Sequence, residues 1–238
     1  IGSPSTDTLL VKQDLALATN VSITSTNQFE GYVKPGDTLT LSFTTPEEID
    51  ELSVTIQDHI PDPDNVTNVG NVYSATAVFD NTYTPGLVTF EIIYKDLFGN
   101  PDTVTAVTDG LGVIYDRTPP TISLVTTYSS NSYNTDYATI DQDGLGDTVY
   151  VRLDASERLR PGMANWTRKI FGKESPTPIS SNNDSTFTAY KVIDTDDPCA
   201  HILGSLGTTI DFEFIFLDFA GNLGTKLGNS SVRCDITP

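Results

Sequence analysis

The stretch FEIIYKDLFGN at residues 90–100 recurs as FEFIFLDFAGN at residues 212–222. In both copies apolar and polar residues alternate up to a shared turn, D-x-x-G-N, and a period of two is typical of a strand with one buried face. We therefore expect two equivalent strands whose buried positions are Phe90, Ile92 and Tyr94 in the first copy and Phe212, Phe214 and Phe216 in the second. The repeat predicts two copies of one folding unit.

Two further marks define the limits of the repeat. Gly36-Asp37-Thr38 and Gly146-Asp147-Thr148 each precede an apolar alternation, and Val113–Ile122 has a shorter counterpart at residues 232–238. We expect the following boundaries: 1–13 as the end of a preceding repeat or a linker strand, 14–115 as the first domain, 116–235 as the second, and 236–238 as the start of a following repeat.

The composition predicts an all-β protein. The 238 residues include one Met and one Trp, and the chain is rich in Thr, Ser, Val, Asp, Gly and Pro, which favours strands and tight turns. Short alternations separated by turn signals give about seven strands in each unit, the number that makes a sandwich of two antiparallel sheets. The predicted fold is two tandem immunoglobulin-like antiparallel β-sandwiches.

Three marks carry a resemblance to a known group of domains. They are D-x-T-x-P-x-I at Asp116–Ile122, G-D-T followed by alternating apolar residues, and D-x-x-G-N. Together they resemble the tandem Ig-like domains of bacterial and microbial-eukaryote surface proteins and adhesins. The resemblance implies a non-enzymatic extracellular or cell-surface segment, either a spacer or a filament-forming array. The first unit departs from the pattern with Asp14-Leu15-Ala16-Leu17.

The charge of the chain excludes several partners. The formal net charge is −19, with only 13 Lys and Arg, so nucleic acid, which needs clustered cations, is not expected to bind. No stretch approaches the roughly 20 apolar residues that a spanning helix needs, so we expect no direct membrane insertion. Of the 32 acidic residues 24 are Asp, which suits either calcium ligation or a solubilising surface, and the charge alone leaves both open.

Calcium is the cofactor that the acidic residues suggest. In a sandwich of this type the start of the first strand, the loop after the second and the loop between the last two meet at the end facing the preceding domain. The candidate ligands of an interdomain ion are Asp116, Glu157 and Asp218, with Asp14, Glu47 and Asp96 as the weaker set in the first unit. Alternatively, these Asp residues only cap turns and the Glu residues face solvent.

Two other acidic segments are weaker candidates. Asp141, Asp143 and Asp147 resemble half of a calcium loop but lack its downstream bidentate Glu, so a Gly-rich turn is the alternative. Asp194–Asp197 is a third candidate or else a solvated loop.

Cysteines and sequons indicate an extracellular compartment. Cys199 and Cys234 are the only cysteines, and they permit one disulfide between a loop and the last strand. N-glycosylation sequons occur at five positions: Asn20, Asn65, Asn165, Asn183 and Asn229.

Catalysis is not expected, because His59 and His201 lie in no recognisable nucleophile arrangement. The alternative function is a carbohydrate-binding, lectin-like module, for which Tyr128, Tyr133 and Tyr137 could form an aromatic surface. Trp166 is expected in the core instead. The expected partners are neighbouring repeats, a protein or glycan on another cell, or copies of the same chain in a fibre.

Overall fold

The protein forms two compact units in the computed structural model, Ile1–Tyr115 and Asp116–Pro238. The structure describes residues 17–140, 146–160, 167–176, 179–180, 184–199 and 207–235. These residues form antiparallel β-sheets and one 3-10 turn at Pro63–Asn65, so the predicted all-β class is confirmed. A helix with the length and apolar character needed to cross a bilayer does not occur among them.

Unit 1 contains two main sheets and a small third one. The first has the order β1 (Thr19–Ser25), β3 (Thr38–Thr44), β6 (Val72–Val78), β5 (Val66–Val69). The second has the order β4 (Ile49–Ile56), β8 (Phe90–Asp96), β9 (Pro101–Val104). The third comprises β2 (Tyr32–Val33), β10 (Ile114–Tyr115) and β7 (Gly86–Leu87), with β10 parallel to β2.

Alternate residues of both main sheets in unit 1 share one core. Leu39, Leu41 and Phe43 of β3 are buried together with the predicted positions of β8, while the residues between them are more exposed. Two sheets packed through such a common core are consistent with a β-sandwich.

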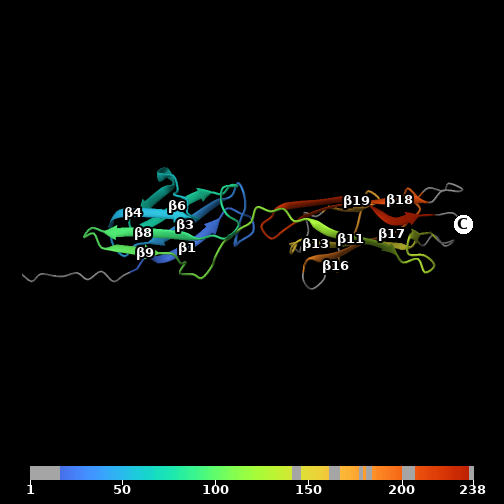
Figure 1. The fold of residues 1–238 in the computed structure, drawn as a ribbon, viewed down its shortest axis with the longest axis horizontal. Helices are drawn as coiled ribbons and strands as arrows, with labels where there is room; N and C mark the ends of the chain where they lie inside the picture. The colour runs from blue at the N-terminus through green and yellow to red at the C-terminus, as the bar shows by residue number, and fades with distance from the viewer. Residues whose placement is uncertain are drawn as a thin grey trace, which may run out of the picture. The chain divides into compact units, whose positions relative to one another are not determined.

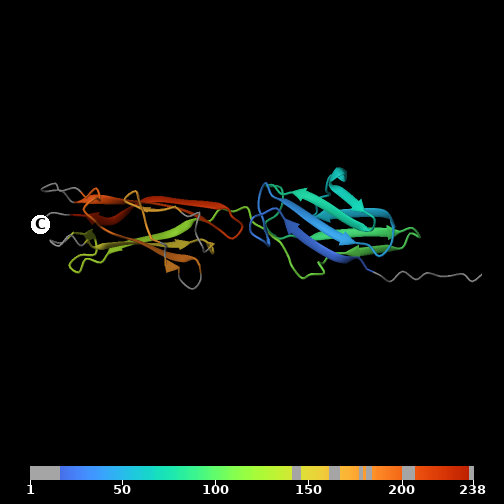
Figure 2. The same cartoon turned by 180° about the vertical axis from the view of Figure 1, so that it is seen from behind.

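Unit 2 repeats this plan, with a longer pair of strands in β18 and β19. One sheet has the order β11 (Ile122–Ser129), β13 (Thr148–Ala155), β17 (Thr186–Val192), β16 (Ile179–Ser180). The other has the order β12 (Tyr137–Ala138), β19 (Leu223–Cys234), β18 (Thr208–Leu217), β14 (Thr167–Ile170), β15 (Lys173–Glu174). Within this unit, the layer with β18 and β19 faces the layer with β11 and β13 (Figure 1), and the view from behind shows the same two layers (Figure 2).

The core of unit 2 is fixed by β18 and by a disulfide. Phe212, Phe214 and Phe216 are buried in one cluster with the inward residues of β13 and β17. The predicted disulfide between Cys199 and Cys234 is present, and it joins the segment after β17 to β19. Both cysteines are buried in the same cluster.

The Asp of the G-D-T mark accepts a hydrogen bond from an Asn side chain in both units. In unit 1 the Asn27 amide donates to the Asp37 carboxylate over 2.7 Å, and the Lys34 N–H donates to the same oxygen over 2.9 Å. In unit 2 Asn131 donates to Asp147 over 2.8 Å. These aspartates therefore hold a loop in place, which is a structural role.

A tight turn in unit 1 is built from unfavourable residues. Ile56 and His59 form an antiparallel bridge, and the two residues between them, Gln57 and Asp58, have φ angles of 50° and 61°. This left-handed region is natural for glycine, whereas a residue with a Cβ is strained there. Asp58 tolerates the conformation better than Gln57 does, because a short polar side chain can bond locally.

We predict that Gln57→Gly stabilises unit 1 by about 1 kcal/mol, because the relief of the left-handed strain exceeds the added freedom of the unfolded chain. Chemical unfolding of the whole chain measures the change. Glu51→Gly in the extended strand β4 is the control and should destabilise. A Gln57→Gly variant that is less stable than the parent would contradict the strain argument.

Candidate metal centre

Three carboxylates of unit 2 converge from separate segments. Asp116 precedes β11, Glu157 follows β13 and Asp218 follows β18, and one carboxylate oxygen from each lies within 4.8 Å of the others. Among the described residues this is the one group of three or more acidic, His or Cys side chains with such spacing. It is the predicted first-choice set, and all three members belong to unit 2.

The D-x-x-G-N turn fixes the position of Asp218. The Asn222 N–H donates to Oδ1 of Asp218 over 2.8 Å, and the Asn222 side-chain amide donates to Oδ2 over 2.8 Å. Gly221 occupies the left-handed conformation that this turn requires, with φ of 82°. The Asn222 amide also donates to the Asp116 carbonyl over 3.2 Å, which ties the start of unit 2 to this turn.

The charge of the cluster is unfavourable without a cation. Burial, and then the negative charges of Asp116 and Asp218, raise the pKa of Glu157 to about 7. Burial also raises the pKa of Asp218, although hydrogen bonds from Asn222 oppose that shift. A bound divalent cation would offset this repulsion, and carboxylate oxygens from several segments are the ligands that calcium takes.

The corresponding turn in unit 1 has the same local structure. The Asn100 N–H donates to Oδ1 of Asp96 over 2.8 Å, and the Asn100 side-chain amide donates to Oδ2 over 2.6 Å. These hydrogen bonds, led by the side-chain one, lower the pKa of Asp96. Capping of the turn therefore accounts for Asp96. Glu47 lies in the loop after β3, and Asp14 lies outside the described residues.

Of the second candidate set, which comprises Asp141, Asp143 and Asp147, the structure describes Asp147. Asp141 and Asp143 lie outside the described residues. The Asp147 carboxylate accepts hydrogen bonds from the side-chain amide of Asn131 and from the N–H of Thr139, at 2.8 and 2.9 Å. This is the turn role that was the alternative for the segment.

Asp194 and Asp197 form ion pairs with two lysines. Lys191 Nζ lies 2.7 Å from Asp197 and 3.1 Å from Asp194, and Lys173 Nζ lies 3.1 and 3.0 Å from the same two carboxylates. The side chain of Asp197 is fully buried and that of Lys191 is 8% exposed. The two lysines therefore offset both carboxylates and hold Asp197 in the interior, whereas the Asp194 side chain is 51% exposed, as the solvated-loop interpretation predicts for it.

Removal of one partner from this network leaves a buried charge. We predict that Asp197→Asn destabilises the protein by about 3 kcal/mol, because Lys191 then keeps its ammonium buried with a weaker set of acceptors. Asp196→Asn, which changes an exposed neighbour, is the matched control and should have almost no effect. Thermal unfolding of the chain with its disulfide intact checks both. Equal stabilities of the two variants would contradict a stabilising role for the Asp197 ion pairs.

The sequon asparagines have different positions. Asn20, Asn65 and Asn229 are exposed, as attachment of a glycan requires, while Asn165 and Asn183 lie outside the described residues. Trp166 and His201 also lie outside them. His59 packs its ring on Tyr83 at a centroid distance of 4.3 Å.

The tyrosines that lie side by side are not the three that the sequence predicts. Tyr128 stacks on Tyr150 of the neighbouring strand, with ring centroids 4.9 Å apart and planes inclined by 16°, and Tyr190 follows at 6.4 Å from Tyr150. Tyr137 belongs to β12 in the other sheet, and Tyr133 is 97% exposed in the intervening loop. Sequence patterns do not reveal this cross-strand row of Tyr128, Tyr150 and Tyr190, because the three residues are far apart in the chain.

Comparison with known proteins adds no relative. The chain matches no protein-family model, and a search of curated protein sequences returned no match to it.

Proposed function

We propose that each unit is an immunoglobulin-like sandwich and that the chain is a non-enzymatic, extracellular structural or adhesive segment of a cell-surface protein. The strand order supports the fold assignment. The order β1-β3-β6-β5 opposite β4-β8-β9 corresponds to the A-B-E-D and C-F-G sheets of a constant-type domain. The order in unit 2 corresponds in the same way, with β15 added beyond β14 and β12 beyond β19.

The observation that carries the proposed role is the repetition of one scaffold with the same two loop-holding aspartate motifs in both units. Both units use the same G-D-T network at one end and the same D-x-x-G-N turn at the other. The described polar clusters are used to hold loops, as the aspartates of both marks show. Such repeated domains typically space or present a binding function.

We further propose that calcium binds unit 2 through Asp116, Glu157 and Asp218. Bound calcium would neutralise three carboxylates and tie the segment before β11 to the loop after β13 and to the β18–β19 turn. Binding to the folded state alone would stabilise the unit by mass action.

The lectin-like alternative is less well supported by the tyrosines. Sugar rings stack on exposed aromatic faces, but Tyr128 and Tyr150 stack against each other. The row is better explained as cross-strand stabilisation of the sheet.

A calcium titration tests the proposed cation site. We predict that unit 2 unfolds at a higher temperature in excess calcium than in chelator. When free calcium is 100 times Kd, the free energy of unfolding should increase by about 2.7 kcal/mol. Glu157→Gln should reduce this gain without lowering stability in chelator, because it removes a repelled charge. Differential scanning calorimetry of the whole chain measures both.

The matched control is Glu47→Gln, which changes the corresponding position of unit 1 and should keep the full calcium effect. If calcium shifts the parent and Glu157→Gln by the same amount, or shifts neither, the cation site is wrong. That result would leave the acidic surface with solubility as its role. The proposed fold and structural role would be unaffected.

A further inference from the structure

The last strand of unit 2 has a free edge. β19 pairs with β18 over Leu223–Asn229, but its other side pairs only with β12 and only at Arg233–Cys234. The neighbouring strand of the opposite sheet, β11, pairs with β13 alone. Over Leu223–Asn229 the far side of β19 therefore has no strand partner among the described residues. Unpaired backbone groups on such an edge are a template for another strand.

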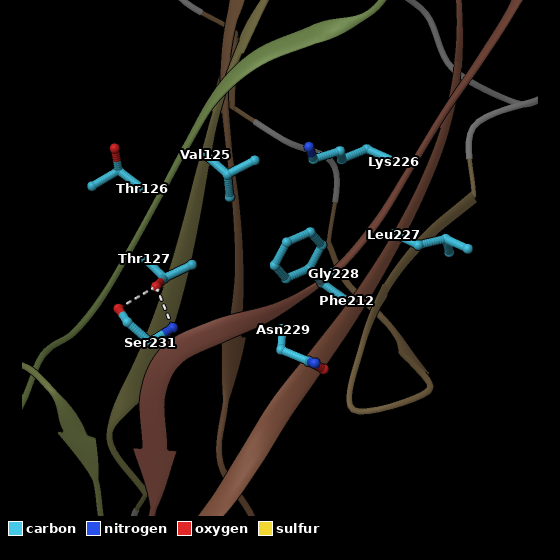
Figure 3. A pocket seen from close by; sticks show the side chains of 9 residues that line it. All are labelled: Val125, Thr126, Thr127, Phe212, Lys226, Leu227, Gly228, Asn229 and Ser231. Carbon is cyan, nitrogen blue, oxygen red and sulfur yellow. Dashed lines mark hydrogen bonds between the residues drawn. The ribbon is translucent and has the colours of Figure 1, made fainter.

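A cavity lies directly beside this edge. It has a volume of about 460 Å³ and is lined by Val125, Thr126, Thr127, Phe212, Lys226, Leu227, Gly228, Asn229 and Ser231. Figure 3 shows the Phe212 ring lying between β11 and β19, with Val125 above it. At one end Thr127 and Ser231 close the gap, since their hydroxyl oxygens are 2.8 Å apart and the Ser231 N–H donates to Thr127 over 3.0 Å.

Gly228 leaves room above the Phe212 ring. A Cβ at position 228 would lie 2.6 Å from the ring, so a larger residue there would displace Phe212. On the outer face of the same strand, Leu223 and Leu227 are 57% and 64% exposed. The free edge thus offers apolar contacts on both of its faces.

Lys226 gives the edge its charge. Its side chain extends over the cavity toward Val125 (Figure 3), and it makes no hydrogen bond or ion pair with another described residue. By contrast, Lys169, Lys173 and Lys191 in the same unit all pair with carboxylates. A strand added to β19 would cover this unpaired ammonium.

We propose that the β19 edge over Leu223–Asn229 binds an extended peptide segment of a partner protein that carries an acidic residue among apolar and β-branched ones. The added strand would pair with the β19 backbone, and an inward apolar side chain would lie in the cavity against Val125. Its carboxylate would pair with Lys226. This interaction surface goes beyond the proposed function and does not depend on calcium.

The charge of Lys226 selects the partner. A neutral or basic strand would cover the ammonium without pairing it, which is costly, whereas an acidic strand pairs it. An inward lysine also protects a free edge from indiscriminate pairing. The net charge of −19 does not prevent the approach of an acidic peptide at physiological salt, because charges further away than about 8 Å are screened.

Titration of the whole chain with blocked synthetic peptides tests this surface. The probe is the heptapeptide TVTDVTV, compared with versions that carry Asn or Lys in place of its Asp, all in chelator. We expect the Asp peptide to bind most tightly and to shift the backbone amide signals of Leu223–Asn229. Lys226→Glu should weaken the Asp peptide by about tenfold or more and make the Lys peptide the preferred one. Lys169→Glu on β14, which is separated from β19 by β18, is the control and should keep the original order.

Any of three results would overturn the proposal. The first is the absence of amide shifts at Leu223–Asn229 with the Asp peptide. The second is an order of peptide affinities that Lys226→Glu leaves unchanged. The third is a concentration-dependent shift of the same amides without peptide, which would make the occupant a second copy of this chain. Because all samples contain chelator, failure here is distinguishable from failure of the calcium site.

Discussion

The burial of alternate side chains of one central strand is the constraint on which each unit depends. Phe212, Phe214 and Phe216 of β18 fill the space between the two sheets of unit 2, and the residues of β8 do so in unit 1. A strand with one aromatic face requires apolar faces from the sheet opposite, so both sheets take fixed positions around it. Polar groups that must be satisfied are then confined to strand ends, outer faces and edges. The candidate sites of this protein lie at those places.

The same turn gives two different electrostatic environments. Asp96 and Asp218 accept the same pair of hydrogen bonds from the Asn four residues later, yet the pKa of Asp96 is lowered and that of Asp218 is raised. Both side chains are buried, but at Asp218 the effect of burial exceeds that of the hydrogen bonds, and the negative charge of Asp116 adds to it. The turn motif therefore determines where a carboxylate is placed, and the surrounding chain determines whether it can become part of a cation site.

Period-two patterns and repeats in the sequence predict the strands, the division into two similar units and the approach of Asp116, Glu157 and Asp218, because these depend on local alternation and on equivalent strand ends. The ion pairs of Lys191 with Asp197 and the stacking of Tyr128 on Tyr150 were not predicted. Both depend on the register between strands or on a loop that folds back, and local patterns do not determine either. The spacing Ser25-x-Asn27 and Ser129-x-Asn131 was a detectable signal for the G-D-T network.

Lys226 and the carboxylate cluster are both exceptions to the pairing of opposite charges in this strongly acidic chain. In a chain with 32 acidic and 13 basic residues, cations are too few to pair every carboxylate, and carboxylates are left to repel one another where strand ends meet. Glu157 lies at such a meeting point. The Lys226 side chain extends from a strand edge over the cavity beside Val125, where no carboxylate of the described residues pairs with it. An acidic strand from a partner protein would satisfy the ammonium and the unpaired backbone groups of β19 together.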